Sequence, residues 1–288
     1  MFTIAGTPGR GLDRGVLPRS WSEGSDLELG PSFLSHPYNL DFYIVRQSGR
    51  THFEKPFLYL LFGTDRAMLV DTGAPGADLV SEVRTLLGRW SSSRGLPAPP
   101  LLVTHTHPHS DHVAGDGQLA ALRNATVVGA GLEDVTRFFG IGAWPDAVGM
   151  VDLGGRPIDV IPIPGHEPAS VAFYDRRTGI LLSGDVLYPG RLYVRDADAF
   201  RASVKRLVRF TAARPIAHIL GAHIENTTTP FLDYPEGTVY QPEEHPLELG
   251  RAHLLELDAA LDAMGAHIER AVFRSFTVWP VATPQNAA

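Results

Sequence analysis

The sequence predicts an α/β protein in which mixed β-sheets are covered by helices. Strand-like and helix-like segments alternate along the chain. Several neighbouring strands are nevertheless separated only by tight turns, which favours antiparallel pairs beside parallel ones. The chain has 288 residues, of which 44% are hydrophobic. This length is sufficient for one large domain with a substantial core.

The first half of the chain alternates between runs typical of strands and of helices. Apolar and β-branched residues predict strands at 42–45, 57–62, 67–70, 101–103 and 126–128. Between them, Leu79, Val83, Leu86 and Leu87 recur at helical spacing and predict a helix over 77–89. A shorter helix is expected at 116–123.

The second half repeats this alternation. We expect a strand at 159–163, a hairpin of 170–174 with 179–183, a helix at 197–213, a strand at 218–220, a polar loop at 226–245, a helix at 246–264 and a strand at 271–281. Residues 1–30 are rich in Gly, Pro and Arg and lack periodicity, so they are predicted to form an N-terminal extension. A single domain would then span 31–288.

Composition excludes several classes of protein. The absence of cysteine excludes a disulfide scaffold, a zinc finger, an iron–sulfur protein and a cysteine nucleophile. The net charge of −7 offers no basic face for nucleic acid. Neither a long apolar run nor the apolar core of a signal peptide is evident, so no membrane partner is expected and a cytoplasmic location is predicted.

The segment 105–112 contains the strongest indication of a functional site. It follows the predicted strand 101–103 and contains four histidines and one aspartate in eight positions, although the whole chain has only 12 histidines. Loops at strand ends are common places for functional residues in α/β proteins. Imidazole and carboxylate groups suit zinc, iron or manganese. The segment therefore predicts a metal site.

Within this segment, His107-x-His109-x-Asp111-His112 resembles the signature of the metallo-β-lactamase-fold hydrolases. Later residues that match the family in order, each after a predicted strand, are His166, Asp185 and His223. The pattern is most similar to the branch of lactonases and glyoxalase-II-like enzymes that binds two metal ions. The resemblance implies an αββα sandwich, in which two mixed β-sheets are flanked by helices.

The resemblance also implies a complete set of metal ligands. One ion would be held by His107, His109 and His166, the other by Asp111, His112 and His223, with Asp185 bridging them. Two zinc ions are the default expectation, because zinc is redox-inert and accepts nitrogen and oxygen ligands. Iron or manganese stays open. Asp71 matches an early strand-end aspartate that would support a ligand histidine or the histidine loop, whereas His105 is expected to pack nearby.

The implied mechanism is hydrolysis of a carbonyl compound. A metal-bound hydroxide would attack the carbonyl carbon, and Asp111 would orient that hydroxide. Tyr188 lies three residues after Asp185, the spacing at which lactonases carry a tyrosine facing the substrate carbonyl. We therefore expect the Tyr188 hydroxyl to stabilise the developing oxyanion.

The sequence indicates the substrate less clearly than the type of reaction. Residues 246–270 contain only Arg251 and Arg270 as basic side chains, which disfavours an anionic tripeptide such as glutathione. An uncharged or weakly charged small molecule is favoured, either a lactone or an acyl thioester or ester. Its pocket is expected to be walled by the loop 226–245 and the aromatic segment 138–144. A histidine-only β-lactam hydrolase and a non-catalytic metal-binding protein are the alternatives, and a homodimer stays open.

Overall fold

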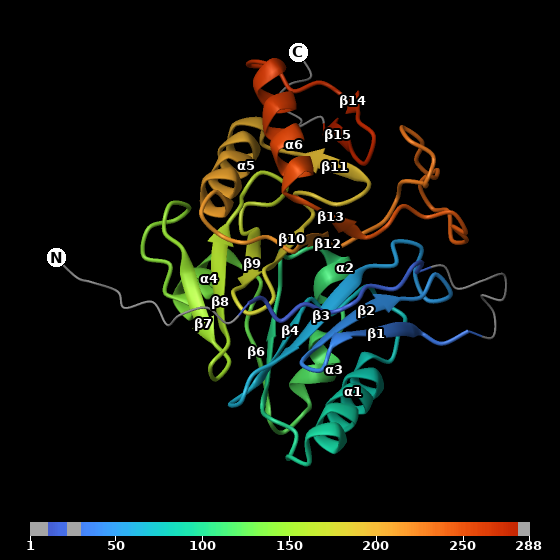
Figure 1. Ribbon diagram of the computed structural model, residues 1–288, viewed down its shortest axis with the longest axis vertical. Coiled ribbons are helices and arrows are strands. Elements are labelled where there is room, and N and C mark those ends of the chain that lie inside the picture. The colour runs from blue at the N-terminus through green and yellow to red at the C-terminus, as the bar shows by residue number, and fades with distance from the viewer. Residues whose placement is uncertain (1–10, 22–29, 282–288) are drawn as a thin grey trace.

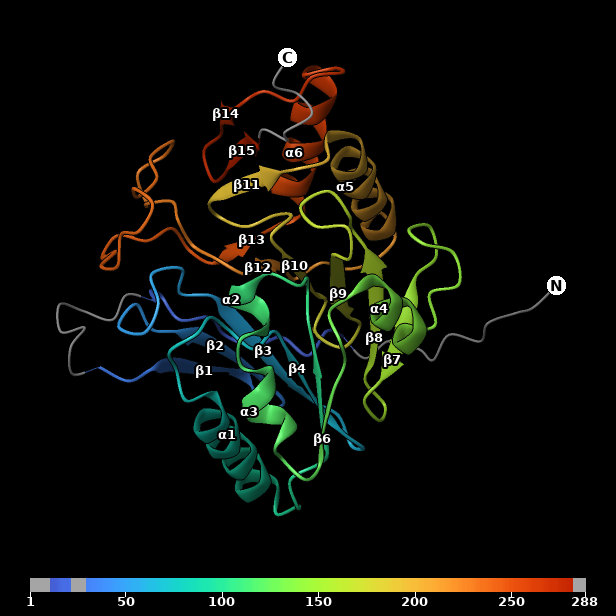
Figure 2. The same ribbon diagram turned by 180° about the vertical axis from the view of Figure 1, so that it is seen from behind.

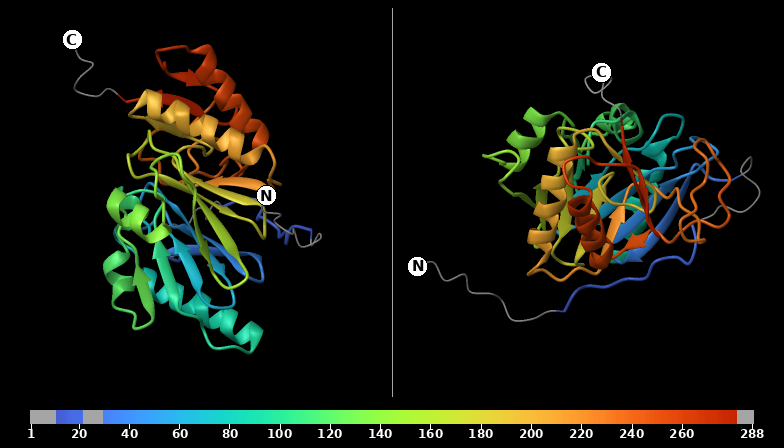
Figure 3. Two further views of the ribbon diagram at one scale, coloured as in Figure 1. Left: turned by 90° about the vertical axis from the view of Figure 1, so that its left-hand side faces the viewer. Right: turned by 90° about the horizontal axis from the view of Figure 1, so that it is seen from above.

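The chain folds into two six-stranded sheets packed face to face, with helices on both outer sides (Figure 1). The computed structural model describes residues 11–21 and 30–281. Seen from the side, helices α5 and α6 cover one sheet and α1 covers the other (Figure 3, left). The predicted αββα sandwich of mixed sheets is thus confirmed.

The first sheet has the order β1-β2-β3-β4-β5-β6. Its strands are β1 (Phe33–Asn39), β2 (Phe42–Gln47), β3 (Phe57–Phe62), β4 (Ala67–Val70), β5 (Leu101–Thr104) and β6 (Ala125–Val127). Strands β1 to β4 pair antiparallel, whereas β4, β5 and β6 run parallel. Every residue of β3 and β4 is buried, since both faces of the sheet are covered.

The second sheet has the order β13-β12-β10-β9-β8-β7. Its strands are β7 (Gly149–Asp152), β8 (Pro157–Pro162), β9 (Val171–Asp175), β10 (Ile180–Gly184), β12 (His218–Gly221) and β13 (Glu248–Leu249). Strands β9 and β10 form the predicted hairpin, and β10 and β12 are parallel. The carboxyl ends of β10 and β12 therefore meet at one edge of the sheet.

A third, smaller sheet was not expected from the sequence. It consists of β11 (Arg191–Val194), β15 (Thr277–Pro280) and β14 (Ala271–Val272) in the order β11-β15-β14. The single strand predicted at 271–281 is therefore two strands that turn back on one another. The helix predicted at 246–264 begins only at Arg251, because the residues before it form β13 beside β12.

The two sheets separate three layers of core, and the helices cover the two outer ones. The helices are α1 (Leu79–Arg94), α2 (Ser110–Val113), α3 (Asp116–Ala120), α4 (Leu132–Phe139), α5 (Ala197–Thr211) and α6 (Arg251–Ala263). One apolar cluster lies between the sheets, a second joins the second sheet to α5 and α6, and a third joins the first sheet to α1. Viewed from behind, α1 and α3 lie on the same outer face of the first sheet (Figure 2).

The described part of the predicted N-terminal extension, residues 11–21, packs along both sheets. The amide of Val16 donates to the carbonyl of Tyr38 at the end of β1, and that of Asp13 donates to the carbonyl of Arg177 between β9 and β10. Trp21 is buried with its ring 5.0 Å from that of Phe57. The rest of the extension, 1–10 and 22–29, lies outside the described residues.

No helix within 11–21 and 30–281 has both the length and the apolar character needed to cross a membrane.

Candidate metal centre

The predicted ligands come together where strands of both sheets end. The segment 105–112 follows β5, His166 lies between β8 and β9, Asp185 follows β10 and His223 follows β12. Gly184 brings β10 against this segment, since it has φ +52° and a Cβ there would lie 2.8 Å from Cβ of Thr106. The seven side chains form two groups of potential ligand atoms: His107, His109, His166 and Asp185, and Asp111, His112 and His223.

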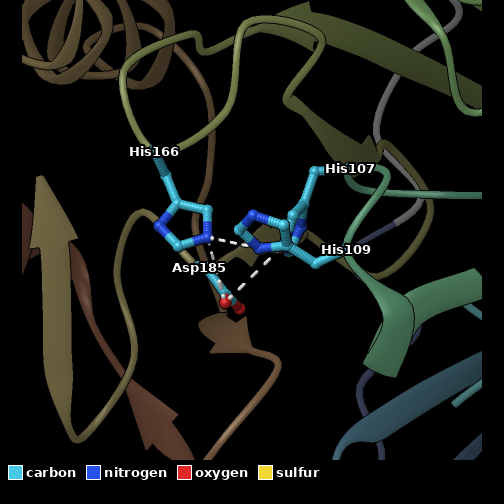
Figure 4. A group of neighbouring side chains, drawn as sticks. All are labelled: His107, His109, His166 and Asp185. Atoms are coloured by element: carbon cyan, nitrogen blue, oxygen red, sulfur yellow. Dashed lines mark hydrogen bonds and ion pairs between the residues drawn. The ribbon is translucent and has the colours of Figure 1, made fainter. Parts of the chain in front are cut away.

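The three histidines of the first group, which we call the three-histidine half, turn ring nitrogens toward one another (Figure 4). Nδ1 of His109 lies 3.0 Å from Nε2 of His107 and 3.1 Å from Nε2 of His166. The remaining nitrogen of each ring contacts an oxygen outside the group: Thr106 Oγ1 for His107 (3.1 Å), Glu167 Oε1 for His109 (2.8 Å) and the Tyr193 carbonyl for His166 (2.9 Å).

These outer contacts decide which nitrogens carry protons. A carboxylate and a carbonyl can only accept, so His109 and His166 donate from their outer nitrogens. Thr106 donates its hydroxyl to Asp71 and thus accepts from His107. Three neutral rings would then turn three lone pairs toward one point. Such an arrangement is favourable only around a cation, so the geometry fits a metal ion.

The second group, which we call the Asp-His-His half, is built around a carboxylate. Oδ2 of Asp111 lies 3.1 Å from Nε2 of His112 and 3.2 Å from Nε2 of His223. The outer nitrogen of His112 donates to the buried carboxylate of Asp71 over 2.9 Å, and that of His223 donates to the carbonyl of Glu54 over 3.1 Å. The predicted supporting role of Asp71 is thus confirmed.

Asp185 lies between the two halves and turns one oxygen toward each. Its Oδ2 is 3.5 Å from Nε2 of His166 and 3.7 Å from that of His107. Its Oδ1 is 3.6 Å from Nε2 of His223 and 3.8 Å from that of His112. Oδ1 and Nε2 of His112 are buried without a hydrogen-bond partner. An ion about 2 Å from each atom would satisfy both, so the residues fit metal at this position too.

The comparison with known proteins agrees with this geometry. A family model described as the metallo-beta-lactamase superfamily matches residues 55–223. This chain belongs to the metallo-β-lactamase superfamily. The matched range contains all seven predicted ligands.

Curated relatives from the superfamily include enzymes named for thioester hydrolysis. The chain is 34% identical over 141 residues to a hydroxyacylglutathione hydrolase of Anaeromyxobacter dehalogenans, covering 46% of either protein. It is 27% identical over 201 residues to an acyl-coenzyme A thioesterase of Bos taurus, covering 58% of this chain and 72% of that one. The chain therefore spans less than half the length of the first of these relatives.

Solved structures show the same fold. A metallo-beta-lactamase from Pontibacter korlensis matches with a TM-score of 0.53 at 16% identity, covering 80% of this chain and 99% of that one. The DIM-1 metallo-beta-lactamase matches with a TM-score of 0.54 at 13% identity, covering 82% and 99%. At these identities, the likeness concerns the superfamily fold alone.

The two halves differ in charge. Burial, reinforced by the neighbouring histidines, lowers the pKa of His107 well below its usual value. Burial also opposes the charge on His223, but Asp185 and Asp111 outweigh it and raise its pKa to about 9. The surrounding carboxylates likewise overcome burial and raise the pKa of His112. Without metal, burial thus disfavours protons on His107 and His166, whereas the raised pKa values of His112 and His223 favour protons in the Asp-His-His half.

Tyr188 does not turn a free hydroxyl toward the ligands. Its hydroxyl donates to the carbonyl of Arg191, and only 1% of the residue is exposed. Its ring packs edge-on against His223, with 5.5 Å between the ring centroids. The oxyanion role stays a prediction, and this hydrogen bond counts against it, because the hydroxyl proton is already donated to a backbone carbonyl.

A cavity of about 460 Å³ opens onto the ligands. The loop 226–245 contributes Tyr234 to its wall, in agreement with the sequence. The expected second wall is wrong: Phe139 and Trp144 pack into the core between the sheets instead, because α4 turns this segment toward β7. The aromatic side chains that take its place are Phe53, Tyr193 and Trp279.

Sequence reasoning missed the side chains that hold the ligands in place. Glu167 follows His166 directly but contacts His109, which lies 58 residues earlier. Glu54 supports His223 through its carbonyl, for which side-chain chemistry offers no signal. Thr106 lies inside the histidine motif, and its hydroxyl next to two ligands was the one available clue. His105 is held outside both halves by Asp116, 2.8 Å away.

Proposed function

We propose that this protein is a metal-dependent hydrolase of acyl thioesters that works with two metal ions. The observation that carries the proposal is the placement of Asp185, whose two oxygens face the two halves separately. A carboxylate shared in this way suits a pair of ions and serves no evident purpose in a metal-free binding protein. The alternative of a non-catalytic protein is therefore not favoured.

Bound divalent ions would activate a water molecule and polarise the substrate carbonyl. The chain's own residues prepare the place for this chemistry. Asp185 holds the two halves at a fixed separation, and Asp111 would orient the attacking water through its second carboxylate oxygen. Outer contacts such as that between His112 and Asp71 keep the imidazoles in the tautomer that leaves their inner lone pairs free.

A thioester is preferred to a lactone or a β-lactam as substrate. The relatives that match by sequence are named for hydrolysis of hydroxyacylglutathione and acyl-coenzyme A, both of which are thioesters. The β-lactamase structures are 13–16% identical and bear on the fold only. A lactone remains compatible with a hydrolytic carbonyl site, but no feature of the cavity favours it.

Zinc is the proposed metal, because neutral imidazoles and carboxylates suit it. Two ions per chain are expected from the two halves. The cytoplasmic location, the absence of a nucleic-acid partner and the possible homodimer stay predictions from the sequence.

The proposal is tested by turnover of matched substrates. Protein purified without chelator is assayed with an acyl thioester, a lactone of similar size and a penicillin, each before and after chelator treatment. We expect thioester hydrolysis to be fastest, to disappear with chelator and to return with zinc. Preferred lactone or penicillin hydrolysis would move the protein to another branch of the superfamily. Undiminished turnover in a verified metal-free protein would reject the metal mechanism.

A further inference from the structure

Two arginines line the cavity, and their surroundings differ. Arg191 is fully engaged: its Nε lies 2.8 Å from Oδ2 of Asp233, one terminal nitrogen lies 3.2 Å from Oε1 of Glu225, and the other donates to the carbonyl of Tyr234. All three nitrogens of this guanidinium are therefore engaged, two of them with residues of the loop 226–245. Arg191 is thus held in place by two carboxylates and a carbonyl, which offset its charge and fix its position.

Arg195 has the opposite character. About half of its side chain is exposed, and its Nε lies 3.8 Å from Oε1 of Glu167, too far for a hydrogen bond. Glu167 already accepts a hydrogen bond from His109, so it does not depend on Arg195 for a partner. Within the described part of the chain, Arg195 is thus the cavity cation with hydrogen-bonding capacity to spare.

The position of Arg195 is nevertheless well defined. Its backbone amide donates to the carbonyl of Gly165 over 3.0 Å, directly before the ligand His166. The following residue, Asp196, caps the N-terminus of α5 by accepting from the amide of Ala199. The root of the Arg195 side chain is therefore anchored beside the three-histidine half.

The side of the cavity at Arg195 differs in charge from the sides at Glu54 and Glu236. Glu54 lines the cavity near the Asp-His-His half, and Glu236 belongs to the loop opposite. An anionic group on a substrate would be repelled by these carboxylates and attracted to Arg195. The aromatic side chains of Tyr193 and Trp279 offer apolar contact to the uncharged remainder.

We propose that Arg195 is a specificity-determining residue that binds an anionic group of the substrate beside the three-histidine half. The inference deepens the proposed thioester hydrolysis and rests on it. It also revises the expectation of an uncharged or weakly charged substrate, which considered only the basic residues of 246–270. The anion belongs either to the acyl group or to the thiol, and the test separates these two sources.

The test compares four thioesters that carry an anionic group on the acyl side, on the thiol side, on both or on neither. Pentanoyl and 4-carboxybutanoyl groups are each joined to N-acetylcysteamine, which is neutral, and to 3-mercaptopropionate, which is anionic. The values of kcat/KM are measured for the unchanged protein and for Arg195→Met, Arg195→Lys and Arg137→Gln. The last is a matched control, because Arg137 lies on the exposed surface of α4 in ion pairs with Glu133 and Asp134.

We expect Arg195→Met to lower kcat/KM for one anionic series about tenfold or more while leaving the neutral thioester within a factor of about two, as loss of a charge-assisted hydrogen bond predicts. The series affected shows whether the anion is on the acyl or the thiol side. Arg195→Lys should restore part of the preference, and Arg137→Gln should leave it unchanged. Equal losses on charged and neutral thioesters, or no loss, would overturn the assignment.

A binding measurement separates this proposal from the proposed function. Glutarate and pentanoate differ by one carboxylate, and their affinities for the zinc-loaded protein are measured by calorimetry. We expect Arg195→Met to weaken glutarate about tenfold and pentanoate hardly at all. If no thioester is hydrolysed but this difference is found, the reaction is wrong and the anion site stands. If thioesters are hydrolysed without any such difference, the anion site is wrong.

Discussion

The two halves of the metal centre differ in the protonation of their histidines when no metal is bound. In the three-histidine half, ring nitrogens face one another and burial lowers the pKa values of His107 and His166. In the Asp-His-His half, the carboxylate of Asp111 lies between the inner nitrogens of His112 and His223 and favours protons on them. One half is therefore arranged for a cation before it arrives, whereas the other must exchange protons for it.

The carboxylates that accept hydrogen bonds from the outer ring nitrogens also differ between the halves, in how deeply they are buried. His112 donates to Asp71, which is completely buried and also accepts from the amide and hydroxyl of Thr106. His109 donates to Glu167, which is partly exposed. The Asp-His-His half is therefore supported from inside the folded core. The three-histidine half is supported by a side chain that solvent can reach.

The largest expected effect comes from removing what the halves share. Asp185→Asn keeps the shape of the side chain but removes its charge, so both ions should bind weakly and thioester turnover should fall by on the order of 10³-fold. His107→Ala should remove only the ion of the three-histidine half. Elemental analysis together with turnover separates these outcomes.

His267→Ala, on an exposed histidine after α6, is the control and should change neither quantity. Retention of two equivalents of metal by Asp185→Asn would contradict the shared role of this carboxylate.

A pH series sharpens the comparison further. Below about pH 9, His223 carries a proton in the metal-free chain that an ion must displace. Zinc affinity of the Asp-His-His half should therefore fall by at least about tenfold for each unit of acidification, and more steeply where a proton on His112 is displaced as well. The lowered pKa values of His107 and His166 disfavour protons on these two rings over the same range, so the zinc affinity of the three-histidine half should depend less on pH.

Competition with a chromogenic chelator measures this between about pH 6 and pH 9. His107→Ala reports on the Asp-His-His half and His223→Ala on the three-histidine half. Parallel pH dependence in both variants would show that the charge difference between the halves has no consequence for binding.

The outer carboxylates allow each half to be weakened separately. Asp71→Asn should lower zinc affinity at the Asp-His-His half and Glu167→Gln at the three-histidine half, each by about 10- to 100-fold, because the ligand imidazole loses a charged acceptor. The same chelator competition measures both variants. A loss at the opposite half, or equal losses at both, would mean that the halves act as one unit.

The smallest effect is expected from Tyr188→Phe. Its hydroxyl donates to the Arg191 carbonyl, so its removal should cost about 1 kcal/mol of stability and reduce turnover by less than about tenfold. An oxyanion donor would instead cost about 10²–10³ in kcat. Thermal unfolding and thioester kinetics of the same variant decide between a positioning role and the role predicted from sequence.

Much of the metal centre could be predicted from the sequence, because its strongest signals are local. His107, His109, Asp111 and His112 stand within six positions at the end of an apolar strand, and this spacing needs no knowledge of the rest of the fold. His166, Asp185 and His223 are recognisable because each follows a strand in family order. The alternation of strands and helices predicted the two-sheet architecture for the same reason.

Tertiary structure alone decided how these groups are held and what surrounds them. The contact of Glu167 with His109, the division of the Asp185 oxygens between the halves and the engagement of Tyr188 with Arg191 depend on the packing of separate strand ends. The third sheet, which brings Trp279 to the cavity, joins strands from distant parts of the chain. Local periodicity records which face of an element is buried, but it contains no information on which distant partner meets that face.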